Sequence, residues 1–175
     1  MDRRNILGLG VLGALGLGFG LTRPGQAAQA GERLPEFQGI SNWLNSQPLS
    51  VNDLRGKVVA VQFWTLGCIN CQRTLPSVVS LYSKYADKGL VIVGVHTPEF
   101  PFERELKNVQ AAIKQRNIAY PVAVDNGFKT WRAYNNEYWP HLFIADRKGI
   151  LRYDHIGEGA YDENERVVKK LLAEA

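Results

Sequence analysis

Two short apolar runs, KVVAVQFW at 57–64 and LVIVGV at 90–95, place the strongest limit on how this chain can fold. Runs that are apolar at nearly every position are typical of strands buried on both faces. Between them, from Cys71 to Lys88, apolar residues recur at helical spacing, and Gly89 ends the pattern. Strands that alternate with helices in this way predict an α/β fold.

The remaining pattern extends this alternation to the end of the chain. A further helix is expected where apolar residues again follow helical spacing, at Phe102, Leu106, Val109 and Ile113. YPVAVD at 120–125 predicts a third strand, and HLFIAD and ILRYDHI flank a turn signal at 147–149 that predicts a hairpin. Residues 31–57 read as an irregular lead-in, and Asp162 with Glu165 as the cap of a last helix. We therefore expect one central mixed sheet with helices on both faces.

The first thirty residues are set apart from this fold by their composition. A basic start at Arg3 and Arg4 precedes an apolar run at 6–21, and Ala28-Gln29-Ala30 matches a signal-peptidase site. The run is sixteen residues long and holds six glycines, so it is shorter than the roughly 20 residues that a spanning helix needs. We expect residues 1–30 to be a cleaved signal peptide that resembles the twin-arginine type, with an uncleaved membrane anchor as the alternative.

The remaining residues, 31–175, are long enough for one domain with its own core. The full chain carries a net charge of +4, and removing residues 1–30 takes away +2 and leaves +2. So small an excess, without a dense basic run, is too little for an electrostatic footprint on nucleic acid. We expect a periplasmic or otherwise exported protein after signal cleavage, in a compartment where disulfides persist.

Both cysteines of the chain, Cys68 and Cys71, lie in one short segment, WTLGCINCQRTLP at 64–76. A disulfide between them would close almost no loop, so it would stabilise the fold little. A structural zinc site takes four protein ligands, of which this pair supplies half. A redox pair or half a metal site remains, and in an exported domain with its own core the pair indicates chemistry rather than structural cross-linking.

The position of the pair in the predicted fold favours redox chemistry. Cys68 lies where the strand at 57–64 meets the following helix, whose N-terminal partial positive charge favours thiolate over thiol. We expect Cys68 to be the exposed attacking group and Cys71, a turn into the helix, to resolve the mixed disulfide. Ile69 and Asn70 between them bring no positive charge, which indicates a reducing rather than a strongly oxidising site.

The segment FWTLGCINC…P at 63–76 resembles the thioredoxin active site, with an aromatic pair, C-x-x-C and a proline five residues after the second cysteine. Residues 36–172 broadly resemble exported thioredoxin-like proteins of the TlpA group. CINCQR, GVHTPEF and YWP are similar to the thioredoxin-like domain of DipZ-type cytochrome c biogenesis proteins. The resemblance implies a thioredoxin-like fold for residues 31–175 and a thiol–disulfide oxidoreductase that uses its dithiol, with no cofactor and no metal.

The resemblance also implies further site residues. In such folds a cis-proline faces the cysteines, and Trp139-Pro140 is the matching pair; sequence by itself could not show a cis bond. Its role would be to expose the backbone of Trp139 for strand-like pairing with a substrate peptide. Trp64, beside the cysteines, is expected to shape access of the substrate, with plain core filling as the alternative.

Two departures from the family pattern leave the route of the proton open. Thioredoxin-like proteins often carry a buried carboxylate six residues before the first cysteine, and Gln62 stands there. Some TlpA-group reductases use a glutamate three residues after the second cysteine, and Thr74 stands there. Glu99 and His96 follow the second strand at the end of the sheet that carries the cysteines. We expect Glu99 to accept the proton of Cys71, with a surface role as the alternative.

The resemblance implies the partners as well. DipZ-type proteins carry a membrane domain that delivers electrons, and here we expect a separate membrane thiol-reductant donor. The clients would be disulfide-containing exported proteins, apocytochrome c among them. No nucleic-acid partner is expected, because the charge is small and scattered.

Two other functions on the same fold stay open. Copper delivery, as in Sco-like proteins, would use Cys68, Cys71 and His141 as two soft sulfurs and an imidazole. Those proteins space their cysteines C-x-x-x-C, unlike this chain. Peroxide reduction has weaker support, because Thr65 lies three residues before Cys68, as in the peroxiredoxin T-x-x-C motif, but Val61 replaces the proline of that motif.

Overall fold

A computed structural model describes residues 30–174 of the chain. The expected signal peptide, residues 1–30, lies outside the described residues except for its last position, so its assignment stays a prediction. Within the described part of the chain, none of the helices has both the length and the apolar character that crossing a membrane requires.

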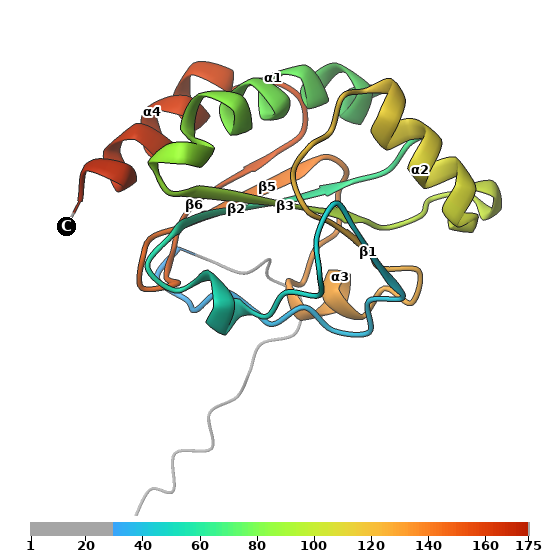
Figure 1. Cartoon of the computed structure of the whole chain (residues 1–175), viewed down its shortest axis with the longest axis horizontal. Coiled ribbons are helices and arrows are strands. Elements are labelled where there is room, and N and C mark those ends of the chain that lie inside the picture. Colours follow the sequence, from blue (N-terminus) through green and yellow to red (C-terminus); the bar gives the residue numbers. More distant parts are fainter. Residues whose placement is uncertain (1–29, 175) are drawn as a thin grey trace, which may run out of the picture.

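A six-stranded sheet forms the centre of the fold. Its strands are β1 (Asn42–Leu44), β2 (Val58–Trp64), β3 (Leu90–His96), β4 (Val122–Val124), β5 (His141–Ala145) and β6 (Leu151–Ile156). They lie in the order β1-β4-β3-β2-β5-β6 (Figure 1). The neighbours β2, β3 and β4 run parallel, and the β1–β4, β2–β5 and β5–β6 pairs are antiparallel. The mixed sheet and the terminal hairpin predicted from the sequence are therefore confirmed.

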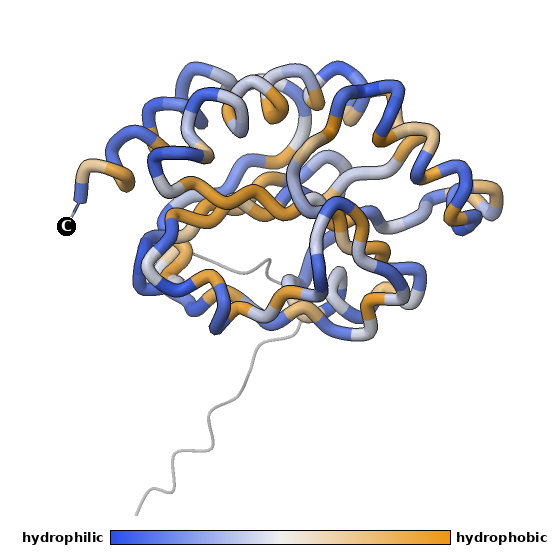
Figure 2. The backbone as a smooth tube through the Cα atoms, viewed as in Figure 1, coloured by the Kyte–Doolittle hydropathy of each residue, from blue (hydrophilic) through white to orange (hydrophobic). Residues whose placement is uncertain are grey.

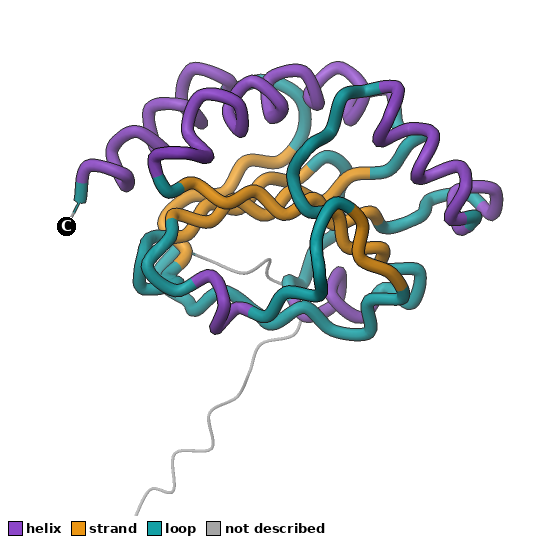
Figure 3. The backbone as a smooth tube through the Cα atoms, in the orientation of Figure 1, coloured by secondary structure: helices purple, strands orange, loops and turns teal. Residues whose placement is uncertain are grey.

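The helices cover the sheet unequally (Figures 1 and 3). They are α1 (Ile69–Tyr85), α2 (Leu106–Gln115), α3 (Lys129–Ala133) and α4 (Tyr161–Ala173), with 3₁₀ turns η1 (Val51–Leu54), η2 (Ala86–Lys88) and η3 (Pro101–Arg104). Helices α1, α2 and α4 pack on one face, and α3 and η1 lie on the other. The β2–α1–β3 and β3–α2–β4 connections step the same way across the sheet, so right-handed crossovers put α1 and α2 on the same face.

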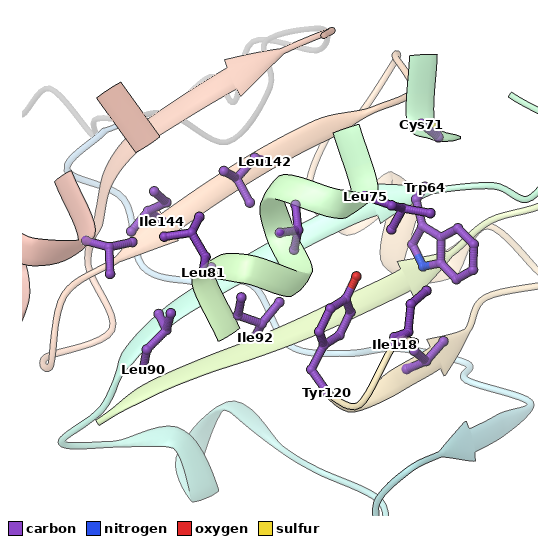
Figure 4. Close-up of a cluster of buried hydrophobic side chains, with 14 of the residues drawn as sticks. Trp64, Cys71, Leu75, Leu81, Leu90, Ile92, Ile118, Tyr120, Leu142 and Ile144 are labelled. Carbon is purple, nitrogen blue, oxygen red and sulfur yellow. The ribbon is translucent and has the colours of Figure 1, made fainter. Parts of the chain in front are cut away.

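Burial of β2 explains its apolar sequence. Every residue of this strand is buried, and alternate side chains enter opposite core clusters. Trp64 points to the cluster beneath α1, where it lies near Leu75 and Tyr120 (Figure 4). Phe63 points to the other cluster, against the ring of Tyr134 at 5.1 Å between centroids. The apolar strands run between the two more polar outer layers in Figure 2.

Three local expectations were wrong. Residues 31–57 contain the short strand β1, which pairs with β4 and was hidden by its length. Phe102 lies on η3 and is 50% exposed, because α2 begins only at Leu106. Helix α4 begins directly after Ala160 without a side-chain cap, so Asp162 and Glu165 do not form the expected one.

Gly94 on β3 leaves room for the rings that fill the core below the cysteines. A Cβ at this position would lie 3.0 Å from Trp64 Nε1 and 3.0 Å from Tyr120 Cε2. Because both rings are fully buried, we expect Gly94→Ala to lower the free energy of unfolding by about 1–3 kcal/mol. Gly127→Ala is the matched control, since its Cβ would meet only the Lys129 side chain at 3.9 Å. Urea unfolding measures both variants, and equal stabilities would contradict the prediction.

Candidate active site

Cys68 lies at the boundary between β2 and α1, as the sequence predicted. It is the N-cap residue of the helix, and its Sγ accepts a hydrogen bond from the backbone N–H of Cys71 at 3.3 Å. The residue is partly exposed, and both cysteines are free thiols. Since the N-terminus of a helix stabilises negative charge, this position suits a thiolate that reacts with molecules from solvent.

Cys71 lies in a different environment, one turn into α1. Its side chain is fully buried, and burial raises the pKa of its thiol far above the usual range. The hydrogen bond and the charge of Cys68 and the charge of Glu99 raise this pKa further, while a hydrogen bond with the Thr65 backbone opposes the shift. The two thiols are therefore unequal, and Cys71 needs a proton acceptor before it can react as a thiolate.

The Trp139–Pro140 peptide bond is cis, which confirms the expectation from the resemblance. The Trp139 carbonyl oxygen lies 3.9 Å from the Sγ of Cys68, which donates to it. The Trp139 indole Nε1–H donates to the carbonyl of Thr97 at 3.1 Å, in the loop that follows β3. Loops before α1, after β3 and before β5 thus meet at Cys68, while Pro140 itself is buried.

Trp64 does not reach this surface. Its side chain is fully buried and packs edge-on against His96 at 5.2 Å between centroids, in the same core cluster as Cys71 and Leu75 (Figure 4). Trp64 therefore fills the core beneath the cysteines. Of the two roles that the sequence left open, this is core filling and not contact with a substrate. The reason is its place at the end of β2, where the strand alternation directs its side chain under α1.

The residues expected to bear on proton transfer lie in three environments. Gln62 is fully buried, and the Tyr120 hydroxyl donates to its Oε1 at 3.5 Å. His96 is also fully buried, and burial lowers its pKa to about 4, so it is neutral near pH 7. Glu99 lies exposed on the loop after β3, yet its charge acts on Cys71. Of these three, Glu99 combines a titratable carboxylate with a position near the buried thiol.

Glu103 is a site residue that the sequence reasoning missed. Its side chain is fully buried at the end of the sheet that carries the cysteines. Oε1 accepts the N–H of Gly67 at 2.7 Å, and Oε2 accepts the N–H groups of Glu99 and Phe100, the latter at 2.7 Å. The carboxylate thus ties the loop before Cys68 to the loop that carries Glu99. Its spacing in FPFE, three residues after the N-cap of η3, was the available signal.

Electrostatics favour the charged form of this buried carboxyl group. Burial by itself would raise the pKa of Glu103, but the amides of Phe100, Gly67 and Glu99 and the Thr65 side chain outweigh it, and the pKa lies below its usual value. A carboxylate that accepts several backbone N–H bonds behaves in this way. Glu103 is therefore an ionised structural anchor beside the candidate site.

His141 does not join the cysteines in a metal site. Its two ring nitrogens bond to Asn136 and Asp154. No group of three or more His, Cys, Asp or Glu side chains within residues 30–174 is arranged to hold a metal ion. The ligand set that copper delivery would require, Cys68, Cys71 and His141, is therefore not brought together.

Removing the Glu103 carboxylate leaves three partly buried amides without their acceptor. We expect Glu103→Ala to lower the free energy of unfolding by at least about 2 kcal/mol near neutral pH. Because the folded-state pKa of Glu103 is depressed, its contribution is present above the unfolded pKa and is lost as the pH falls through the folded value. The difference from wild type should therefore shrink on acidification. Urea unfolding at several pH values, with exposed Glu137→Ala as control, tests this; a constant difference would contradict it.

The chain is similar in sequence to one known protein family and to individual known proteins. Residues 30–154 match the model of the AhpC/TSA family. Protein DipZ of Mycobacterium tuberculosis is 44% identical over 144 residues, which are 81% of this chain and 21% of DipZ. The chain therefore spans about a fifth of the length of this relative. Thiol-disulfide oxidoreductase YkuV of Bacillus subtilis is 28% identical over 141 residues, which are 81% of this chain and 95% of YkuV.

The fold comparison agrees with the sequence comparisons. The solution structure of a thioredoxin-like protein in its oxidised form superposes with a TM-score of 0.74 and 29% identity, over 81% of this chain and 95% of that one. The six-stranded mixed sheet and the four helices of residues 30–174 thus form a thioredoxin-like fold. Because the family model matches well over half of the chain, from residue 30 into β6, the chain belongs to the AhpC/TSA family as a thioredoxin-like member.

Proposed function

We propose that this protein is a thiol–disulfide oxidoreductase that reduces disulfides of exported client proteins through Cys68 and Cys71. One observation carries the proposal: the Sγ of Cys68, at the N-cap of α1, accepts the N–H of Cys71 and faces the Trp139 carbonyl beside the cis-proline. The name of YkuV, a thiol-disulfide oxidoreductase that matches over nearly its full length, supports the same reaction class.

The reaction transfers two electrons from the dithiol to the client. The Cys68 thiolate attacks one sulfur of the client disulfide, whose S–S bond breaks, and the other client sulfur leaves and takes up a proton. Cys71 then loses its proton and attacks the Sγ of Cys68, which releases the second client thiolate. The client ends as two thiols and the enzyme as a Cys68–Cys71 disulfide. A thiol reductant, which we propose is delivered by a separate membrane partner, restores the dithiol.

Glu99 is the proposed proton acceptor for Cys71. The raised pKa of the buried thiol makes its deprotonation the difficult part of the second step. The position used by many thioredoxin-like proteins is occupied by Gln62, which does not titrate, and His96 is buried. Glu99 is exposed and its backbone N–H is held by Glu103, so its loop has a defined position beside the site.

The Trp139–Pro140 segment is the proposed docking edge for the client. An extended client segment would pair with the backbone of Trp139, as peptides add to the edge of a sheet, and so would bring its cysteine to Cys68. Export is supported by the signal-peptide pattern of residues 1–30. Apocytochrome c is proposed as one client on the resemblance of CINCQR, GVHTPEF and YWP to DipZ-type biogenesis proteins.

The unequal cysteines give the first test of function. We expect Cys68→Ser to abolish reduction of a disulfide substrate, because the attacking sulfur is lost, and Cys71→Ser to accumulate mixed disulfides on Cys68. Mass spectrometry of non-reduced mixtures with an oxidised client detects the trapped species. If Cys71→Ser lost all thiol reactivity while Cys68→Ser kept it, the two roles would be reversed. Consumption of hydrogen peroxide in place of the disulfide would instead support the peroxidase alternative.

The second test concerns Glu99. We expect Glu99→Gln to slow disulfide reduction by about tenfold or more, because an amide cannot accept the proton of Cys71. Asp87→Asn, on η2 at the opposite end of α1, is the matched control and should keep the wild-type rate. Single-turnover kinetics separate formation of the mixed disulfide, which should be unaffected, from its resolution. An unchanged rate of resolution in Glu99→Gln would show that Glu99 is a surface residue that does not accept the proton of Cys71.

A further inference from the structure

His141, the residue after the cis-proline, is held at both ring nitrogens. It begins β5 and is fully buried, with its ring against Phe143 at 3.9 Å between centroids. Nδ1 lies in hydrogen-bond contact with Asn136 Oδ1, and Nε2 lies 3.0 Å from Asp154 Oδ2. The proposed reaction does not use this buried titratable group, so its two acceptor partners need another explanation.

The hydrogen bonds around His141 need one proton more than a neutral imidazole carries. Asn136 donates through Nδ2 to the Tyr138 carbonyl at 3.0 Å, so its Oδ1 faces His141 and Nδ1 must donate. Nε2 of a neutral ring would then direct a lone pair at the Asp154 carboxylate. If the Asn136 amide were rotated by 180°, its Oδ1 would face the Tyr138 carbonyl oxygen, and that contact would then lack a proton. A proton between His141 and Asp154 satisfies every contact.

These contacts lead directly to the segment that faces Cys68. Asn136 holds the carbonyl of Tyr138, next to Trp139, and the Pro140 carbonyl accepts the N–H of Gly157 at 2.8 Å, just after β6. We propose that Asp154, His141 and Asn136 are positioning residues that set the Trp139–Pro140 docking edge according to whether a proton is shared between His141 and Asp154. This inference rests on the proposed function, because the edge is the proposed site of client pairing.

Few charged or titratable groups among the described residues affect the protonation of His141. Asp154 and His155, both on β6, are the charged or titratable groups that act on His141. Asn136 is neutral, and the register partner on β2 is Phe63. The Asp154 side chain is 37% exposed, so protons exchange with solvent through it. Burial lowers the pKa of His141, and the hydrogen bond and charge of Asp154 offset this effect only in part.

The sign of the pH dependence follows from these contacts. At low pH the proton is shared and the docking edge is held in place. As the pH rises, the proton is lost, the Nε2 lone pair faces the carboxylate and the edge is released. Because the pKa of His141 is lowered, this change falls below the pH of about 6.5 at which an unperturbed histidine titrates. Client binding should therefore weaken toward neutral pH, independently of the chemistry of the thiols.

Asp154→Asn tests the inference, because an asparagine amide donates to a neutral Nε2 without any titrating proton. We expect the KM of the wild-type protein for an oxidised client peptide to rise by about threefold or more across the pH range in which the NMR signals of His141 titrate. The KM of Asp154→Asn should stay constant over the same range, while kcat follows the thiol titration in both proteins. Asp162→Asn, on α4, is the control that should keep the wild-type dependence. Equal KM profiles in wild type and Asp154→Asn would overturn the inference.

A second readout does not depend on activity. In NMR titrations of the wild-type protein, the His141 ring signals and the Trp139 backbone amide should shift with one common pH midpoint. In Asp154→Asn this common transition should disappear. If the protein reduces no disulfide but the two signals still titrate together, the proposed function fails and the positioning role stands. If His141 titrates while the Trp139 amide does not move, the positioning role is wrong whatever the activity.

Discussion

Burial of β2 on both faces is the constraint on which the rest of the structure depends. A strand covered on both sides must end where its apolar run ends, and Trp64 is its last residue. The chain then turns at once into α1, so that Cys68 occupies the helix N-cap. The reactive position is thus set by the core: side chains of β2 fill both clusters, and the helix that carries Cys71 must pack on one of them. Hydrophobic burial, rather than any contact between the cysteines, places the thiols.

The polar groups around the cysteines arise where the loops at one end of the sheet meet. The loops before α1, after β3 and before β5 lie together because β2 is hydrogen-bonded to both β3 and β5. Glu103 joins the first two through backbone amides, and Trp139 joins the last two through its indole. A buried carboxylate is stable here only because several N–H groups converge on it. The same fixed loops hold one cysteine near solvent and the other in the core.

Much of the fold could be predicted from the sequence, and the errors share a physical cause. The long strands β2 and β3 are near-continuous apolar runs and α1 has clear helical spacing, so they were placed correctly. β1 is three residues long and is stabilised by pairing with β4, which lies far along the chain. Phe102 follows the spacing of α2, yet the 3₁₀ turn around it is held by Glu103 and leaves its ring exposed. Short elements take their structure from distant partners, which local patterns do not contain.

The resemblance to thioredoxin-like proteins indicated Trp139–Pro140 as the segment opposite the cysteines. The sequence by itself determined the alternation of strands and helices and the position of the C-x-x-C pair at a strand–helix junction. Those features depend on local periodicity and on motif spacing. Only the tertiary structure decided that Trp64 is buried, that Glu103 anchors two loops and that His141 lies between Asn136 and Asp154. Each of these features is either the burial of a side chain or a contact between residues on different loops and strands. They exist only once the sheet brings its strand ends together, because a side chain's partners are set by packing in three dimensions.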